Sequence, residues 1–354
     1  MTITERSGTS AAGPIRPPAD FAPHVLDAYL RQRLGLTGDM RLERVAGGQS
    51  NPTWFVTYDD RRLVLRKKPA GEVLPSAHAV DREYRVMTAL ASTDVPVPTT
   101  LFYHDEPDIV GTPFYLMERL DGRVVHDNAL PGMTPAERTA VYRSMAETLA
   151  RLHAVDWAAI GLEGYGRPGN YFARQIARWT KQWQLSKTKE LPDIERLITW
   201  LPEHIPADDL STIVHGDFRV GNVMLHPTEP RVIGVLDWEL STLGHPLADL
   251  AHSCMAWHSS PDEFGGLVGL DLDALGLPDE ADFTAVYYRH CGHDQRLLPF
   301  HHAFALFRFA VIFEGIAARS LAGNAAADDA AEMGALSARF AARAIEVVDG
   351  RPHG

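Results

Sequence analysis

The sequence predicts an α+β fold in two lobes, with a small β-rich N-lobe and a larger, mainly helical C-lobe. The chain has 354 residues, 45% of them hydrophobic, which is enough for a core that at this length usually divides in two. The first third has strand-like segments around glycine turns, and the later part repeats apolar residues at helical spacing. We expect a disordered leader over residues 1–20, the N-lobe over residues 21–122 and the C-lobe over residues 123–354.

The composition argues against several classes of partner. Lys and Arg number 34 against 46 Asp and Glu, and the formal net charge is -12, so no basic field is available to hold a nucleic-acid backbone. No run approaches the ~20 apolar residues that a membrane span needs. Cys254 and Cys291 are too few for a disulfide framework. We expect a cytoplasmic protein that binds neither nucleic acid nor membrane; the oligomeric state stays open.

The N-lobe is predicted to contain a small β-sheet. We expect a helix over residues 21–34 and strands over residues 42–46, 54–58, 62–66 and 114–117. A glycine turn, Gly47-Gly48-Gln49-Ser50-Asn51, joins the first two strands. The last strand runs into a segment typical of a hinge between lobes.

A helix beginning at Asp81 carries a carboxylate on its apolar face. Glu83 lies three, four and seven residues before Val86, Met87 and Leu90, so all four share one side of the helix. A carboxylate that points into the protein needs a partner.

The C-lobe opens with a clear helix start. Thr134 is the expected N-cap, Pro135 the first helical residue, and Glu137 completes a capping box. Residues 171–200 have helical spacing and many Trp, Arg and Lys residues. A strand then leads into a loop at Asp217, and a hairpin over residues 223–236 ends at Asp237. From Ala248 onward the chain is mainly helical.

The residues around this loop have the spacing that phosphoryl transfer requires. That reaction needs an aligned hydroxyl and oxygen ligands for the cations on the phosphates. In His215-Gly-Asp217-(four residues)-Asn222, the Asp and Asn have the separation found in the catalytic loop H-R-D-x-x-x-x-N. Asp217 would orient the acceptor hydroxyl or accept its proton. Asn222 and Asp237 would ligate Mg²⁺, which prefers oxygen ligands.

These motifs resemble the aminoglycoside-phosphotransferase-like kinases, which have a protein-kinase-like two-lobed fold with His-Gly-Asp in the catalytic loop. The resemblance covers about residues 40–320. It is carried by His215 to Asn222, then Val235-Leu-Asp-Trp-Glu239, then Gly244-His-Pro-Leu-Ala-Asp-Leu-Ala251. The glycine turn with Pro52, the segment Leu65-Arg-Lys-Lys-Pro69, and Asp237 to Gly244 are similar to a subgroup related to the kinase-like domain fused to some acyl-CoA dehydrogenases.

The resemblance implies a binding site for ATP with Mg²⁺. Gly47, Gly48, Gln49, Ser50 and Asn51 would cover the phosphates, although the turn lacks the full G-x-G-x-x-G pattern. Arg66 stands where the family has its phosphate-holding lysine, and it would pair with Glu83. Lys67, the alternative, would point to the opposite face of the strand. Met117 and Glu118 would meet the adenine at the hinge. The preference for ATP over GTP stays open.

Several other residues admit two interpretations. His245, Asp249 and His252 could be metal ligands, but a structural role is favoured, and the resemblance implies that Asp249 braces the catalytic loop. Trp179 and Trp183 are helix-spaced, which favours the core over a substrate wall.

The predicted function is phosphoryl transfer to a hydroxyl of a small molecule. The subgroup resemblance suggests a hydroxyacyl-CoA or another hydroxy acid derivative, and the cationic stretch Arg174, Arg178 and Lys181 favours an anionic acceptor. An aminoglycoside or choline-like acceptor and a non-catalytic nucleotide-binding protein are the alternatives. A protein kinase is disfavoured because no activation segment with an A-P-E ending follows Asp237.

Overall fold

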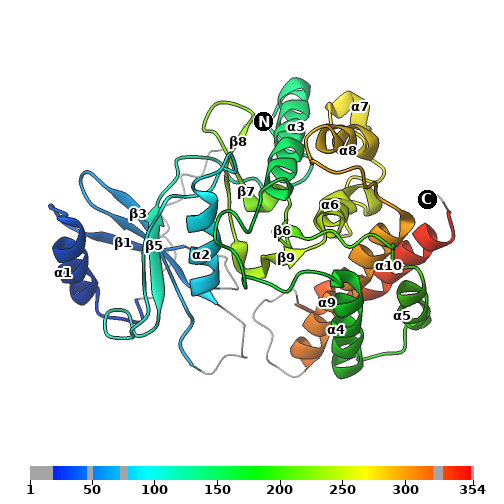
Figure 1. Cartoon of the computed structure of the whole chain (residues 1–354), viewed down its shortest axis with the longest axis horizontal. Helices are drawn as coiled ribbons and strands as arrows, with labels where there is room; N and C mark the ends of the chain where they lie inside the picture. Colours follow the sequence, from blue (N-terminus) through cyan, green and yellow to red (C-terminus); the bar gives the residue numbers. More distant parts are fainter. Residues whose placement is uncertain (1–18, 46–50, 72–78, 322–329, 352–354) are drawn as a thin grey trace, which may run out of the picture. The chain divides into compact units, whose positions relative to one another are not determined.

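The computed structural model describes residues 19–45, 51–71, 79–321 and 330–351. The expected leader therefore lies almost wholly outside the described residues. The chain divides into two compact units (Figure 1). The first comprises Met1–Val80 and Leu101–Arg119, and the second comprises Asp81–Thr100 and Leu120–Gly354.

The first unit is built on a sheet. Its strand order is β1-β2-β3-β5-β4, and β1, β2, β3 and β5 pair antiparallel. Leu26 and Leu30 of the helix α1 pack into an apolar cluster with Trp54 and Phe114 of the sheet. The bounds are α1 (Pro23–Leu34), β1 (Arg41–Arg44), β2 (Thr53–Thr57), β3 (Arg62–Lys67), β4 (Thr100–His104) and β5 (Phe114–Glu118).

Each strand predicted for the N-lobe is present, and β4 was not predicted. Only Phe102 of β4 is buried, so its sequence lacks the apolar alternation by which a half-buried strand is recognised. The prolines at 96 and 98 just before it are typical of a turn.

From Asp81 onward, the helix α2 (Val80–Leu90) groups with the second unit rather than with the sheet. Arg85 donates to the carbonyls of Gly161 and Glu163, and Arg82 donates to the carbonyl of Ser241. The unit boundary therefore differs from the expected lobe boundary in this segment. Glu83 is 1% exposed, as the inward-facing pattern predicts.

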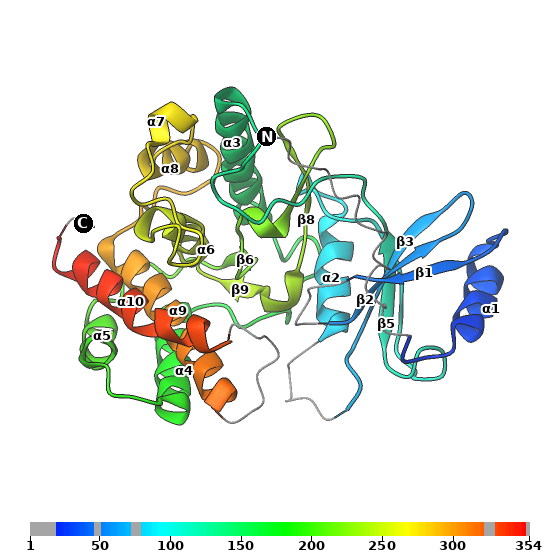
Figure 2. The same ribbon diagram turned by 180° about the vertical axis from the view of Figure 1, so that it is seen from behind.

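The second unit is mainly helical. The predicted capping box is present at the start of α3, where Thr134 and Glu137 cap each other. In Figures 1 and 2, α10 lies along α9, and apolar residues of both belong to one core cluster. The helices are α3 (Pro135–His153), α4 (Tyr171–Ser186), α5 (Pro192–Glu203), α6 (Pro246–Cys254), α7 (Leu272–Leu275), α8 (Glu280–Tyr288), α9 (Pro299–Leu321) and α10 (Ala330–Val348).

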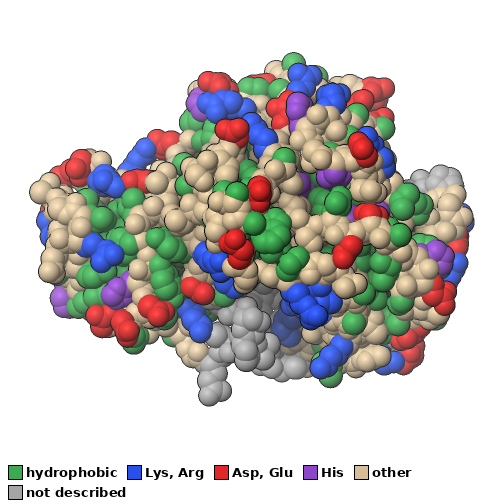
Figure 3. Space-filling view, in the orientation of Figure 1, with side chains coloured by type: hydrophobic (Ala, Val, Ile, Leu, Met, Phe, Trp, Pro, Cys, Tyr) green, Lys and Arg blue, Asp and Glu red, His purple; other side chains and the backbone are tan. Residues whose placement is uncertain are grey.

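The tryptophans of α4 belong to the core of the second unit. Trp183 is fully buried and Trp179 packs against the same cluster, so their helix spacing reflects packing. On the face in Figure 3, acidic and basic side chains are interspersed. None of the helices in the described ranges has the length and apolar character needed to cross a bilayer.

Two small two-stranded sheets hold the loop that carries the sequence motif. β6 (Thr212–Val214) pairs with β9 (Thr242–Gly244), and β7 (Val223–Leu225) pairs with β8 (Val232–Val235). Three short helical turns occur in this part of the chain. The turn η1 (Val220–Asn222) precedes β7, η2 (Trp238–Leu240) precedes β9, and η3 (Met255–His258) follows α6. The β7–β8 hairpin was predicted, whereas β9 was not.

Candidate active site

The predicted loop and the strand tip beyond it are joined through two hydrogen bonds. Val223 pairs with Val235 in the β7–β8 hairpin, so Asn222 and Leu236 are neighbours. The N–H of Leu236 donates to the carbonyl of Asn222 at 2.8 Å, and Nε2 of His215 donates to the carbonyl of Leu236 at 2.8 Å. His215 thereby orders the loop, and Asp237 directly follows this fixed position.

Asn222 is hydrogen-bonded to Asp217. Its Nδ2 donates to the Asp217 carbonyl at 2.8 Å and to Asp217 Oδ2 at 2.6 Å. Both bonds use the amide nitrogen. The amide oxygen, the atom that would ligate a cation, takes part in neither.

Asp237 has a left-handed backbone, with φ 64° and ψ 64°. Non-glycine residues seldom adopt this conformation, although Asp and Asn do so more often than most. Such backbone conformations are frequent at functional sites, where the surrounding structure enforces them. Asn222 is hydrogen-bonded to Leu236, the residue before Asp237, and both side chains offer the oxygen ligands that Mg²⁺ prefers.

His252 of α6 contacts the predicted catalytic carboxylate, which the sequence did not reveal. Its Nε2 donates to Asp217 Oδ1 at 2.9 Å, and the ring is almost completely buried. Burial lowers the pKa of His252 by more than Asp217 raises it, so the imidazole is neutral at physiological pH and acts as a hydrogen-bond donor.

Asp217 is held in its ionised form. Burial alone raises the pKa of its carboxyl, but the hydrogen bond from His252 and the nearby Arg219 guanidinium outweigh burial and hold this pKa well below the ordinary range. Arg219 Nε lies 3.4 Å from Oδ2. The side chain of Asp217 keeps 25% of its surface exposed, so a hydroxyl from solvent can reach it.

Asp249 holds the catalytic loop in place through two hydrogen bonds from the loop backbone. Its Oδ2 accepts the N–H of His215 at 2.6 Å and its Oδ1 accepts the N–H of Gly216 at 2.8 Å. Burial raises the pKa of this carboxyl, yet the hydrogen bonds from His153 and the loop lower it further than burial raises it. Arg308 of α9 donates to the Gly216 carbonyl.

His245, Asp249 and His252 do not converge on a metal position in the described part of the chain. His245 pairs with Asp208 at 2.7 Å, whereas Asp249 and His252 serve the loop as above. Because each of these polar side chains has a hydrogen-bond partner, all three can be buried.

The nucleotide-site candidates of the first unit are described only in part. Gly47, Gly48, Gln49 and Ser50 lie outside the described residues, and Asn51 is buried. In the pairing of β3 with β5, Arg66 lies opposite Tyr115. Met117 and Glu118 lie on β5, where Glu118 forms an ion pair with Arg61.

Lys67 is committed elsewhere in the first unit. Its Nζ donates to Asp20 Oδ2 and to the Val110 carbonyl, both at 2.8 Å, and the side chain is 1% exposed. Because neighbouring strand residues point to opposite faces, Arg66 lies on the other side of the sheet. The phosphate role stays a prediction for Arg66.

A cavity of about 370 Å³ in the second unit adjoins the Asp217 neighbours. Arg219 and His252 line it together with an apolar wall. That wall includes Tyr142, Met145, Met255, Phe283, Phe309 and Phe340. Among the described residues, no Asp or Glu lines it. Sequence spacing could not predict this cavity, because its wall comes from α3, η3, α8, α9 and α10.

Comparison with known proteins shows the family of the chain. The family model described as "Phosphotransferase enzyme family" matches residues 41–284. A crystal structure of a candidate aminoglycoside phosphotransferase from Ralstonia eutropha has 45% identity and a TM-score of 0.86, covering 94% of this chain and 100% of that one. An aminoglycoside phosphotransferase, APH(4)-Ia, solved with AMP-PNP and hygromycin B, has 18% identity, covers 91% of this chain and 99% of that one, and at a TM-score of 0.59 shares the fold.

The chain also resembles part of two larger proteins. It is 43% identical over 345 residues to mouse acyl-CoA dehydrogenase family member 10, covering 94% of this chain and 32% of that protein. It is 39% identical over 334 residues to human acyl-CoA dehydrogenase family member 11, covering 91% of this chain and 42% of that protein. The chain therefore spans less than half the length of these relatives. With its kinase-like fold, it belongs to the phosphotransferase enzyme family.

Proposed function

We propose that this chain transfers the γ-phosphoryl group of ATP to a hydroxyl of a small-molecule acceptor. The observation that carries the proposal is the partly exposed Asp217 carboxylate, which is hydrogen-bonded by His252 and Asn222. Its neighbours His252 and Arg219 line the apolar cavity. A carboxylate fixed in this way can accept a hydrogen bond from an incoming hydroxyl and hold its oxygen in line with the phosphorus.

The low pKa of Asp217 makes positioning its main contribution. A weak base takes the hydroxyl proton only late, once the new oxygen–phosphorus bond has begun to form. This suits phosphoryl transfer, whose transition state is loose and needs alignment and charge neutralisation more than a strong base. The acceptor oxygen bonds to phosphorus, the bond from phosphorus to the β–γ bridging oxygen breaks, ADP leaves, and the proton passes to Asp217.

In this proposal, several residues balance the charge on the phosphates. Asn222 and Asp237 would hold Mg²⁺, which neutralises the β- and γ-phosphate oxygens when bound. Arg66 would hold phosphate oxygens with its forked guanidinium. The 47–51 turn would cover the phosphates, and Met117 and Glu118 would meet the adenine.

The acceptor is proposed to be a hydroxyacyl-CoA or another hydroxy acid derivative. The wall of Met, Phe and Tyr side chains suits an acyl chain, and Arg219 suits an anionic group. An aminoglycoside polycation would call for carboxylates, and the described lining has none. The names of the partly matched relatives, acyl-CoA dehydrogenases, agree with an acyl acceptor.

The test is an acceptor panel followed by ADP release and by mass spectrometry of the product. Hydroxyacyl-CoAs of increasing chain length, free hydroxy acids, aminoglycosides and amino alcohols are compared at equal concentration. We expect phosphorylated hydroxyacyl compounds, with kcat/KM rising with chain length until the cavity is filled. Phosphorylation of only the cationic acceptors would overturn the acceptor class, and no product from any of them would favour the non-catalytic alternative.

A further inference from the structure

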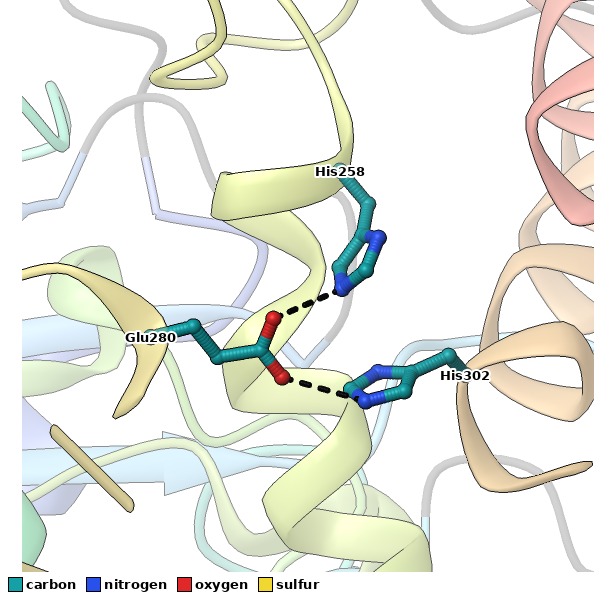
Figure 4. A group of neighbouring side chains, drawn as sticks. All are labelled: His258, Glu280 and His302. Atoms are coloured by element: carbon teal, nitrogen blue, oxygen red, sulfur yellow. Dashed lines mark hydrogen bonds and ion pairs between the residues drawn. The ribbon is translucent and has the colours of Figure 1, made fainter. Parts of the chain in front are cut away.

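Three metal-ligating side chains meet at a second place in the second unit, apart from the phosphoryl-transfer residues. His258 ends η3, Glu280 begins α8, and His302 lies in the first turn of α9. Figure 4 shows the carboxylate of Glu280 between the two imidazoles. Glu280 Oε2 lies 2.8 Å from His258 Nε2, and Glu280 Oε1 lies 3.0 Å from His302 Nε2.

The three ligand atoms are close enough to share one ion. They all lie within 4.8 Å of one another. Zinc bonds to imidazole nitrogen and carboxylate oxygen are near 2.1 Å, so tetrahedral coordination separates two such ligands by about 3.4 Å. The present nitrogen–oxygen distances are a few tenths of an ångström shorter. A small rotation of the side chains is therefore enough to admit an ion.

The donor set selects among cations. Two imidazole nitrogens and one carboxylate oxygen form a site that suits Zn²⁺, whereas Mg²⁺ and Ca²⁺ prefer oxygens alone. Three protein ligands leave the fourth position of a tetrahedral ion to water. The exposed fractions of the His258, His302 and Glu280 side chains are 12%, 13% and 26%, so the group is shielded but an ion can enter from solvent.

Surrounding contacts hold the three ligands in place. Burial raises the pKa of the Cys254 thiol, and the nearby Glu280 carboxylate raises this pKa further. The centroids of the His258 and His302 imidazole rings lie 4.5 Å apart. Trp257 Nε1 donates to the Pro278 carbonyl at 2.9 Å, which ties η3 to the segment that leads into α8.

We propose that His258, Glu280 and His302 bind one zinc ion that fastens η3, α8 and α9 together. η3 also supplies Met255 and Ala256 to the wall of the 370 Å³ cavity, so the ion would stiffen that wall. The site is distinct from the oxygen ligands Asn222 and Asp237, and it stands whether or not the phosphotransferase proposal holds.

The test is zinc binding by the full chain after treatment with a chelator. Zn²⁺ is titrated by calorimetry with Mg²⁺ in excess, so that oxygen-only sites do not compete. We expect one zinc per chain and a rise in the thermal midpoint, because an ion that binds only the folded state stabilises it. Wild-type protein that binds no zinc would overturn the proposal.

Variants locate the ion. His302→Gln and Glu280→Gln should each weaken zinc binding by at least roughly tenfold, the loss that altering even an outer-shell partner causes. The exposed His290, changed to Gln, is the matched control and should bind as wild type does. Circular dichroism of the metal-free variants checks that they are folded. Equal zinc affinity in His302→Gln and His290→Gln would show that the ion binds elsewhere and would contradict the proposed ligands.

Cobalt gives an independent readout of geometry. Co²⁺ in a four-coordinate site absorbs visible light far more strongly than six-coordinate Co²⁺. We expect this absorption in the wild type, its loss in His258→Gln, and its displacement by Zn²⁺. A weak six-coordinate spectrum that is the same in wild type and variant would contradict the site.

Discussion

His252 donates a hydrogen bond from Nε2 to Oδ1 of Asp217 at 2.9 Å, and the donor is a buried, neutral imidazole. The two residues are 35 positions apart in sequence and come from α6 and the loop after β6. This bond fixes one carboxylate oxygen, while Asn222 binds the other. His252 is therefore a positioning residue for the proposed reaction.

Removing this donor should change the pH dependence of turnover. His252 is one of the groups that lower the pKa of Asp217, so His252→Phe should raise that pKa. Since the carboxylate form is the active one, the acid limb of the kcat profile should move up by about one to two pH units, the equivalent of one charged hydrogen bond. His252→Gln keeps an N–H donor and should shift the limb less. An unmoved acid limb in His252→Phe, with the protein folded, would remove this role.

Asp249 should contribute to stability as well as to loop geometry. Asp249→Asn places an amide group opposite two backbone N–H donors, and we expect the free energy of unfolding to fall by about 3 kcal/mol in urea titrations. The folded-state pKa of Asp249 is lowered, so the wild-type contribution is present above the ordinary aspartate pKa of about 3.9 and is lost as pH falls through the folded value. The control is Asp294→Asn, at an exposed position. If both variants lost the same free energy of unfolding, Asp249 would not stabilise the loop.

Gly216 should tolerate no side chain. Its φ is 86°, and a Cβ atom would lie 2.8 Å from the Leu240 carbonyl oxygen. Gly216→Ala should therefore incur the left-handed backbone cost of about 1–2 kcal/mol and also displace the loop, lowering kcat. Gly164, with φ 74° and no atom within 4 Å of its Cβ position, is the matched control. If Gly216→Ala lost no more stability or activity than Gly164→Ala, the close contact would not matter.

Arg66 and Lys67 should separate nucleotide binding from stability. Arg66→Met should raise the KM for ATP by about 10- to 100-fold, the value of one charge-assisted hydrogen bond. Lys67→Met breaks the contacts to Asp20 and Val110 and should lower the thermal midpoint while leaving KM nearly unchanged. The opposite ranking of KM values would make Lys67 the phosphate ligand.

Local signals in the sequence predicted the elements that carry the motif. The Thr134 capping box and the turn before β8 specify their backbone through nearby residues, and both are present. The likeness of the loop from His215 to Asn222 predicted the family, which the comparisons confirm.

Features that depend on packing between distant parts of the chain could not be predicted from local sequence. The bond between His252 and Asp217, the apolar cavity, and the meeting of His258 with His302 join residues far apart in the chain. The spacing of Asp249 and His252, three residues apart on one face of α6, is the one local hint that both serve the same loop.

The most direct measurement of the central claim is ADP release by Asp217→Asn in the presence of an acceptor that the wild type phosphorylates. The amide side chain of this variant retains an oxygen for the His252 hydrogen bond, but its NH2 group faces the Asn222 amide nitrogen. The thermal midpoint is therefore measured alongside kcat to show that the variant is folded. We predict that kcat falls by about 10²- to 10⁴-fold, the usual contribution of a proton-accepting group. Wild-type kcat in the folded variant would show that Asp217 does not act on the acceptor hydroxyl.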